Sequence, residues 1–183
     1  MREQAKSENI PCSAQDMEKL SVAINPSDQH TPPDRLGLFF SHMILFGNDK
    51  EYRIRTAHWD LCPSYLGRHI DKNLVVDGDV GGHFGHEAGS YGSPNPVIIV
   101  NGNAGYAAGS GLNGASITIK GNAGNSLGNN MLCGVITVKG NAGYSVGGGM
   151  IRGFIFIEGE LETISDNITG GKIYHKGKLV FPK

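Results

Sequence analysis

The second half of the chain repeats a short alternation of apolar and polar residues. Two positions of this alternation are apolar in every copy: Leu74, Ile98, Ile117, Ile136 and Ile155 at the first, and Val76, Val100, Ile119, Val138 and Ile157 at the second. Thr118, Thr137, Lys120 and Lys139 lie between or after them. A period of two is typical of a strand with one buried face. Each copy therefore predicts one short strand.

A glycine-rich turn follows each predicted strand. The first glycine of the turn is Gly78, Gly102, Gly121, Gly140 or Gly159, and the last four of these are 19 residues apart. The first two are 24 residues apart, and Gly177 follows Gly159 after 18 residues. A third glycine of the turn recurs at Gly85, Gly109, Gly128 and Gly147. Glycine permits positive φ and close approach of backbones, so the spacing predicts about five stacked coils with sharp corners.

Stacked strands about 4.8 Å apart satisfy one another's backbone groups and enclose a continuous apolar interior. A polar column after the first glycine, formed by Asp79, Asn103, Asn122 and Asn141, is expected to make a side-chain ladder. We therefore expect an all-β-dominated fold, a right-handed single-stranded parallel β-helix over residues 71–183. A glycine-rich disordered tract is the alternative, and the regular apolar columns argue against it.

The first half predicts an N-terminal α+β cap over residues 1–70. Residues 13–24 favour a short amphipathic helix, and the proline-rich stretch 26–34 favours a loop. The apolar run 36–46 and the alternating run 52–57 are expected to form a β pair joined near residues 47–49. Solenoids need caps at their open ends, and we expect the first half to provide one, with the helix free to dock on a partner.

Composition and charge narrow the classes of function. The chain has 183 residues, 28 of them glycine, and a formal net charge of −1, which gives no electrostatic footprint for nucleic acid. No run approaches the length of a membrane span, and the N-terminus lacks a signal-peptide pattern. The three cysteines form no metal-binding or disulfide pattern. A soluble cytoplasmic protein without nucleic-acid or membrane partners is the expectation.

Residues 89–151 contain only two charged side chains, Lys120 and Lys139. So long a stretch with little charge suggests that at least one face of the β-helix is covered, by the first half of the chain or by a partner.

Two catalytic motifs coincide with the repeat. Residues 143–147 (GYSVG) and 124–128 (GNSLG) fit the G-x-S-x-G nucleophile pattern, but their glycines belong to the repeat columns and the equivalent residue one coil earlier is Ala107. Residues 109–114 (GSGLNG) fit G-x-G-x-x-G, but a predicted strand follows where a dinucleotide site requires a helix. Both motifs are interpreted as products of the repeat.

Two groups of residues remain as candidate chemistry. His83, His86 and Glu87 form a tight group of metal-ligand types at one predicted corner, and two histidines with a carboxylate can bind a metal; polar corner residues are the favoured alternative. Residues 58–62 (HWDLC) place a histidine, a carboxylate and a thiol together. Neighbours on a strand face opposite sides, so a packed Trp59 and a buried Cys62 are favoured over a catalytic site.

The repeat unit at residues 131–147, MLCGVITVKGNAGYSVG, resembles the GXGXG repeat family. That family includes the C-terminal domain of the glutamate synthase large subunit and a β-helical component of formylmethanofuran dehydrogenase. The resemblance covers residues 74 to about 177 and implies a β-helical scaffold without catalytic residues or cofactors of its own, packed against catalytic domains. This chain has no N-terminal cysteine nucleophile and no cluster-binding cysteines, and fold alone does not determine chemistry.

The resulting expectation is a non-catalytic scaffold or assembly subunit of a larger oxidoreductase-type complex. The alternative is a self-assembling homo-oligomer with its own small-molecule or metal site near His83 and His86. Hydrolase activity at Ser145 is a third hypothesis.

Overall fold

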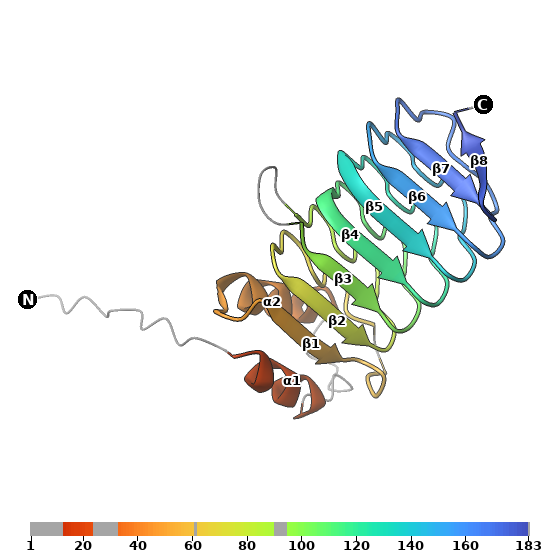
Figure 1. Cartoon of the computed structure of the whole chain (residues 1–183). Helices are drawn as coiled ribbons and strands as arrows, with labels where there is room; N and C mark the ends of the chain where they lie inside the picture. The colour runs from red at the N-terminus through yellow and green to blue at the C-terminus, as the bar shows by residue number, and fades with distance from the viewer. Residues whose placement is uncertain (1–12, 24–32, 61, 90–94, 183) are drawn as a thin grey trace, which may run out of the picture.

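The computed structural model describes residues 13–23, 33–60, 62–89 and 95–182. They form two helices followed by eight strands in chain order (Figure 1). The helices are α1 (Ala14–Ala23) and α2 (Pro33–Phe46). The strands are β1 (Glu51–Arg55), β2 (Asn73–Asp77), β3 (Val97–Val100), β4 (Asn113–Ile119), β5 (Cys133–Val138), β6 (Phe154–Ile157), β7 (Lys172–His175) and β8 (Lys178–Phe181).

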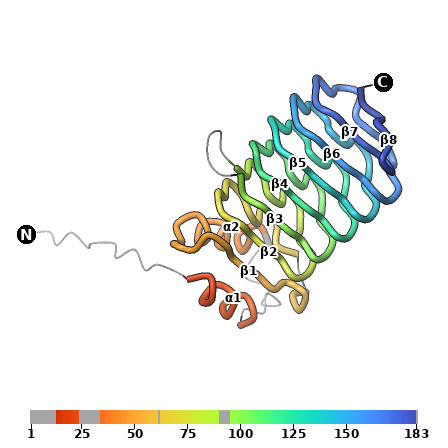
Figure 2. Tube along the Cα trace, viewed as in Figure 1, coloured from red at the N-terminus to blue at the C-terminus, as the bar shows by residue number. Residues whose placement is uncertain are grey.

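The strands form one sheet in sequence order, which is the topology of a parallel β-solenoid of about six turns. Strands β1 to β7 pair in parallel, each with the next, and the chain winds through one coil between them (Figure 2). Strand β8 turns back and pairs antiparallel with β7. The β-helix predicted from the glycine repeat is confirmed.

The predicted inward columns form the core. In register, Leu74 pairs with Ile98, which lies beside Ile117, and the column continues through Ile136 and Ile155. These side chains and those of the second predicted column, Val76, Val100, Ile119, Val138 and Ile157, are buried. Each short strand thus buries a face that it has no means of burying alone, because the neighbouring coils complete the interior.

The third glycine of each turn allows successive coils to approach closely. Gly85, Gly109, Gly128 and Gly147 all have φ between +63° and +75°. A Cβ built on Gly128 would lie 2.7 Å from Cδ1 of Ile155, the inward isoleucine of a later coil. Glycine is therefore favoured there for its backbone angle, and a Cβ in its place would also require Cδ1 of Ile155 to shift.

The polar column makes the expected ladder, in a side-chain-to-backbone form. Oδ1 of Asn103 accepts from the backbone N–H of Asn122, and Oδ1 of Asn122 accepts from that of Asn141, both at 2.8 Å. The ladder continues from Asn141 to the N–H of Glu160. Each amide oxygen satisfies a backbone donor of the next coil at a corner where no strand pairing is available.

The predicted N-terminal helix is confirmed over the described residues as α1. Oγ of Ser13 accepts from the N–H of Asp16 at 3.1 Å, and the carboxylate of Asp16 accepts from Ser13 in return, which is a reciprocal cap of the helix start. Arg55 and Trp59 tie α1 to the first coil, since the N–H of Arg55 donates to Oγ of Ser21 and Nε1 of Trp59 donates to the Ser21 carbonyl.

The prediction of a strand at residues 36–46 is wrong, because this segment is helical and forms most of α2. Its buried apolar residues, Leu36, Phe40 and Ile44, recur every four residues, as on one side of a helix. Leu38, Phe39 and Phe46 on the other sides are also apolar but exposed. Because large apolar residues lie on more than one side of the helix, the sequence shows no clear amphipathic period that would predict it. Most of the predicted loop at 26–34 lies outside the described residues; Pro33 and Asp34 begin α2.

The strand predicted at 52–57 is confirmed as β1 with a different partner. It pairs in parallel with β2, so the solenoid sheet begins at Glu51, inside the segment assigned to the cap. Helices α1 and α2 lie at this end of the sheet (Figure 1). Neither described helix has the length and apolar character needed to cross a membrane.

Two glycine-to-alanine substitutions separate backbone strain from coil contact. Gly177 has φ +76° with open space around it, whereas Gly128 has φ +65° with Ile155 in contact. We expect Gly177→Ala to cost about 1 kcal/mol of unfolding free energy and Gly128→Ala about 1–3 kcal/mol more, from overpacking. Urea unfolding of the two variants measures the difference. Equal losses would show that the isoleucine contact is not a constraint.

Candidate functional site

Reactive side chains gather at the corners of the first two coils. Three columns of the repeat carry them: Tyr65 and His83 share one, Arg68 and His86 the second, and His69 and Glu87 the third. In later coils the same columns hold Ala107, Ser126 and Ser145, then Ser110, Asn129 and Gly148, then Gly111, Asn130 and Gly149. The cluster is therefore a local departure from the repeat, not a product of it. We call Tyr65, Arg68, His69, His83, His86 and Glu87 the corner cluster.

The corner cluster is in mutual contact. The Tyr65 and His83 rings stack with centroids 4.7 Å apart and planes 5° from parallel. Nε2 of His69 lies 3.1 Å from Oε2 of Glu87. Nδ1 of His86 lies 3.5 Å from the same oxygen without making a hydrogen bond to it. One carboxylate oxygen therefore lies between two imidazoles from consecutive coils.

The backbone under the cluster is strained. Tyr65, His69, His83 and Glu87 all have φ between +55° and +58°. This left-handed conformation costs a non-glycine residue about 1 kcal/mol, and glycine or asparagine would adopt it at lower cost, as Gly111 and Asn130 do in a later coil. Large reactive side chains at such positions favour a functional role over a purely structural one.

The cluster also contains unsatisfied polar atoms. Among the described residues, the buried side-chain nitrogens or oxygens without a hydrogen-bond partner are Nε of Arg68, Nδ1 of His83 and Nδ1 of His86. A buried polar atom without a partner costs about 1–3 kcal/mol. Burial lowers the pKa of His86 and the Glu87 carboxylate opposes this; the guanidinium of Arg68 and the neighbouring imidazoles lower that pKa further. A neutral His86 is thus held among groups that can carry positive charge.

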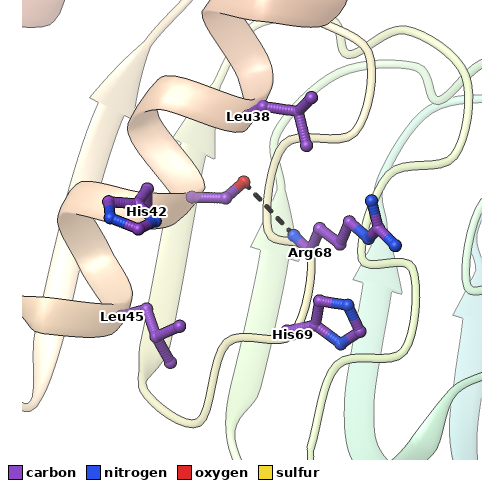
Figure 3. A pocket seen from close by; sticks show the side chains of 6 residues that line it. Leu38, His42, Leu45, Arg68 and His69 are labelled. Carbon is purple, nitrogen blue, oxygen red and sulfur yellow. Dashed lines mark hydrogen bonds between the residues drawn. The ribbon is translucent and has the colours of Figure 1, made fainter.

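A groove of about 270 Å³ lies beside the cluster, between α2 and the first coil. Figure 3 shows Leu38, His42 and Leu45 on the helix side and Arg68 and His69 on the coil side. Ser41 lies between them, where its Oγ accepts from the N–H groups of Gly67 at 2.8 Å and Arg68 at 3.2 Å. The hydroxyl thereby fixes the first corner against the helix.

The predicted metal candidates lie together, but the described side chains do not form a metal centre. His83 and His86 have ring centroids 5.9 Å apart, and Glu87 faces His69. No group of three or more His, Cys, Asp or Glu side chains in the described part of the chain is placed to hold a metal ion. Sequence reasoning missed Tyr65, Arg68 and His69, because the first coil lacks the repeat's glycine pattern; the 18-residue offset from His83, His86 and Glu87 was the available signal.

The G-x-S-x-G and G-x-G-x-x-G patterns lie at ordinary turns of the repeat. Ser126 and Ser145 share the positive φ of Ala107, and the N–H of Ser145 donates to Oγ1 of Thr163 at 3.0 Å. The depression beside Ser145 is lined by Thr163, Ile164, Ser165, Asp166 and Asn167, which include no histidine to act as a base. The segment after Gly109 leads into β4, not into a helix.

Within residues 58–62, Trp59 lies in the core and Cys62 lies on the surface. Trp59 is buried against Phe40, with ring centroids 5.7 Å apart, as predicted. The prediction of a buried Cys62 is wrong, because this residue is exposed at the corner of the first coil. Partial desolvation of the thiol, and then the charge of Asp79, raises its pKa, which disfavours the nucleophilic thiolate. Leu61 lies outside the described residues.

The outer face of the sheet is a second functional candidate. The outward residues of strands β3 to β6 are partly or fully exposed and none is charged; they are Val97, Ile99, Ser116, Thr118, Val135, Thr137, Phe154 and Phe156. We call these eight residues the sheet patch. Ion pairs lie at its margins, Arg53 with Asp77 at one end and Lys139 with Glu158 beside β5 and β6. The patch thus combines apolar side chains on β3 and β6 with uncharged polar ones on β4 and β5, and depletion of charge inside a charged rim is a feature of protein interfaces.

Comparison of the chain with protein-family models, curated proteins and solved structures finds no significant match. Any functional conclusion therefore depends on the cluster, the groove and the sheet patch.

The lowered pKa of His86 predicts a pH effect on stability. Below the ordinary histidine pKa of 6.5 the unfolded chain binds a proton that the folded chain resists, so stability should fall as pH decreases from 8 to about 5.5. His86→Gln removes this contribution, and its urea midpoint should fall less over that range than that of the parent. His58→Gln, exposed and outside the cluster, is the matched control. An identical fall in the parent and His86→Gln would contradict the prediction.

Proposed function

We propose that this chain is a non-catalytic β-helical scaffold, an assembly subunit that docks on the catalytic subunits of a larger oxidoreductase-type complex. The sheet patch is the observation that carries the proposal. Phe154 is 41% exposed and Val97 46% exposed on a sheet without an outward charge from β3 to β6. Large exposed apolar side chains on a face without charge favour an interaction surface.

The rigidity of the patch supports a scaffold role. Its side chains project from strands that are hydrogen-bonded on both sides, and the rings of Phe156 and Tyr174 stack with centroids 5.0 Å apart. A preformed surface loses little conformational freedom when a partner binds. The resemblance of the repeat to the GXGXG family is the reason for naming an oxidoreductase-type partner.

The alternative is a homo-oligomer in which two copies pack sheet to sheet through the same patch. Exposed hydrophobic sheets commonly pack face to face about 10 Å apart. Light scattering of the purified chain distinguishes the two: a monomer favours a different partner, and a stable dimer whose mass halves in Phe154→Lys favours self-assembly.

A capture experiment tests the scaffold proposal. Tagged parent chain is used to recover partners from a native lysate, beside Phe154→Lys in the patch and Leu132→Lys in the turn before β5. Leu132 is 42% exposed, so the two substitutions place the same charge at sites of matched exposure on different surfaces. We expect an oxidoreductase or amidotransferase subunit to be recovered with the parent and Leu132→Lys, and at least about tenfold less with Phe154→Lys, a loss of about 1.4 kcal/mol.

The proposal fails if only the tagged chain itself is recovered. It also fails if Phe154→Lys and Leu132→Lys recover the partner equally, because the interaction would then not use the sheet patch.

A further inference from the structure

The groove between α2 and the first coil has the charge of an anion site. Three of its six lining side chains, His42, Arg68 and His69, can carry a positive charge, and none of the six is acidic. Leu38 and Leu45 supply apolar walls on the helix side (Figure 3). The lining therefore places Arg68 and His69 on the coil side, opposite the two leucines and His42 on the helix side.

Arg68 and His69 form the coil side of the groove. In Figure 3 the guanidinium of Arg68 and the ring of His69 project from the same corner, one above the other. The guanidinium carbon lies 6.0 Å from the centre of the Tyr65 ring, which itself stacks on His83. The ring pair limits the positions available to the arginine, and a planar guanidinium matches the two oxygens of a carboxylate or phosphate.

Glu87 orients His69. The 3.1 Å contact between Nε2 of His69 and Oε2 of Glu87 directs that nitrogen toward the second coil, and the other ring nitrogen, Nδ1, is directed away from the carboxylate. Glu87 itself does not line the groove, so Arg68 is the group of fixed charge among the lining side chains.

We propose that this groove binds a small organic anion, a carboxylate or phosphate that carries a short aliphatic group. Arg68 and His69 hold the oxyanion, and Leu38 and Leu45 hold the aliphatic group. The site accounts for the strained residues His69 and Glu87, which the repeat replaces with glycine or asparagine in later coils. It also gives a role to an arginine whose Nε is buried without a partner, since an anion that draws the side chain outward supplies an acceptor.

Titration calorimetry of the full chain tests the site with three probes of equal chain length: hexanoate, hexyl phosphate and hexanol. We expect saturable binding of at least one of the two anions and at least about tenfold weaker binding of hexanol. Binding of hexyl phosphate alone identifies the anion as a phosphate, and binding of hexanoate identifies a carboxylate. No saturable binding of either anion up to about 10 mM overturns the proposal.

Two substitutions locate the site independently of each other. His69→Asn removes the imidazole and keeps a residue that tolerates φ +57°, as Asn130 does in the same column. Arg68→Gln removes the guanidinium. Each should weaken anion binding by at least about tenfold, whereas Lys120→Gln, which removes an exposed positive charge on a later coil, should not change it. Circular dichroism confirms that each variant is folded, and unchanged affinity in a folded His69→Asn or Arg68→Gln variant overturns the assignment.

This site and the scaffold role are separate. Loss of anion binding in His69→Asn with partner capture intact supports the groove alone, and the sheet patch is tested by Phe154→Lys without reference to the groove.

Discussion

The close approach of one coil to the next is the constraint on which the structure depends. Each parallel strand finds its backbone partners only in the coils before and after it, so the corners must bring the chain back at a fixed spacing. Gly109 and Gly128 meet this need because their positive φ turns the chain while the space beside them is filled by isoleucines of later coils. The asparagine ladder also holds the coils at this spacing, because its side-chain oxygens accept backbone hydrogen bonds where strand pairing stops.

The corner cluster is informative because its residues differ in type from those at the same turn positions of later coils. The turns of the later coils hold small residues at these left-handed positions, such as Ala107, Ser126 and Gly111. In the first two coils, Tyr65, His69, His83 and Glu87 occupy the same left-handed positions with large polar or aromatic groups. Strain at four positions that contact one another is more easily explained by a shared function than by packing, since glycine or asparagine would satisfy the backbone at lower cost.

The fold followed from the sequence wherever the repeat was regular. Strands β2 to β6, their inward columns and the polar ladder could all be predicted, because the period of two and the spacing of glycines reflect the same stacking. The run that forms α2 could not, because it is apolar on every side and only tertiary packing selects the helix. The cluster was half predicted: His83, His86 and Glu87 are adjacent in sequence, whereas Arg68 and His69 come from a coil that lacks the glycine pattern and meet them only through the winding of the chain. The exposure of Cys62 was likewise decided by the path of that first coil.

Ser41 and Lys72 join α2 to the first coil, since Oγ of Ser41 accepts from Gly67 and Arg68 and Nζ of Lys72 donates to the Leu45 carbonyl. The linear arrangement of the coils gives these contacts a directional consequence. In a solenoid, energetic coupling passes chiefly between nearest neighbours. A change in how firmly α2 holds Gly67 and Arg68 is therefore transmitted to the second coil and attenuated beyond it. We therefore expect a change at the groove to affect the stability of the first two coils more than that of the strands that carry the sheet patch, which lie farther along the axis.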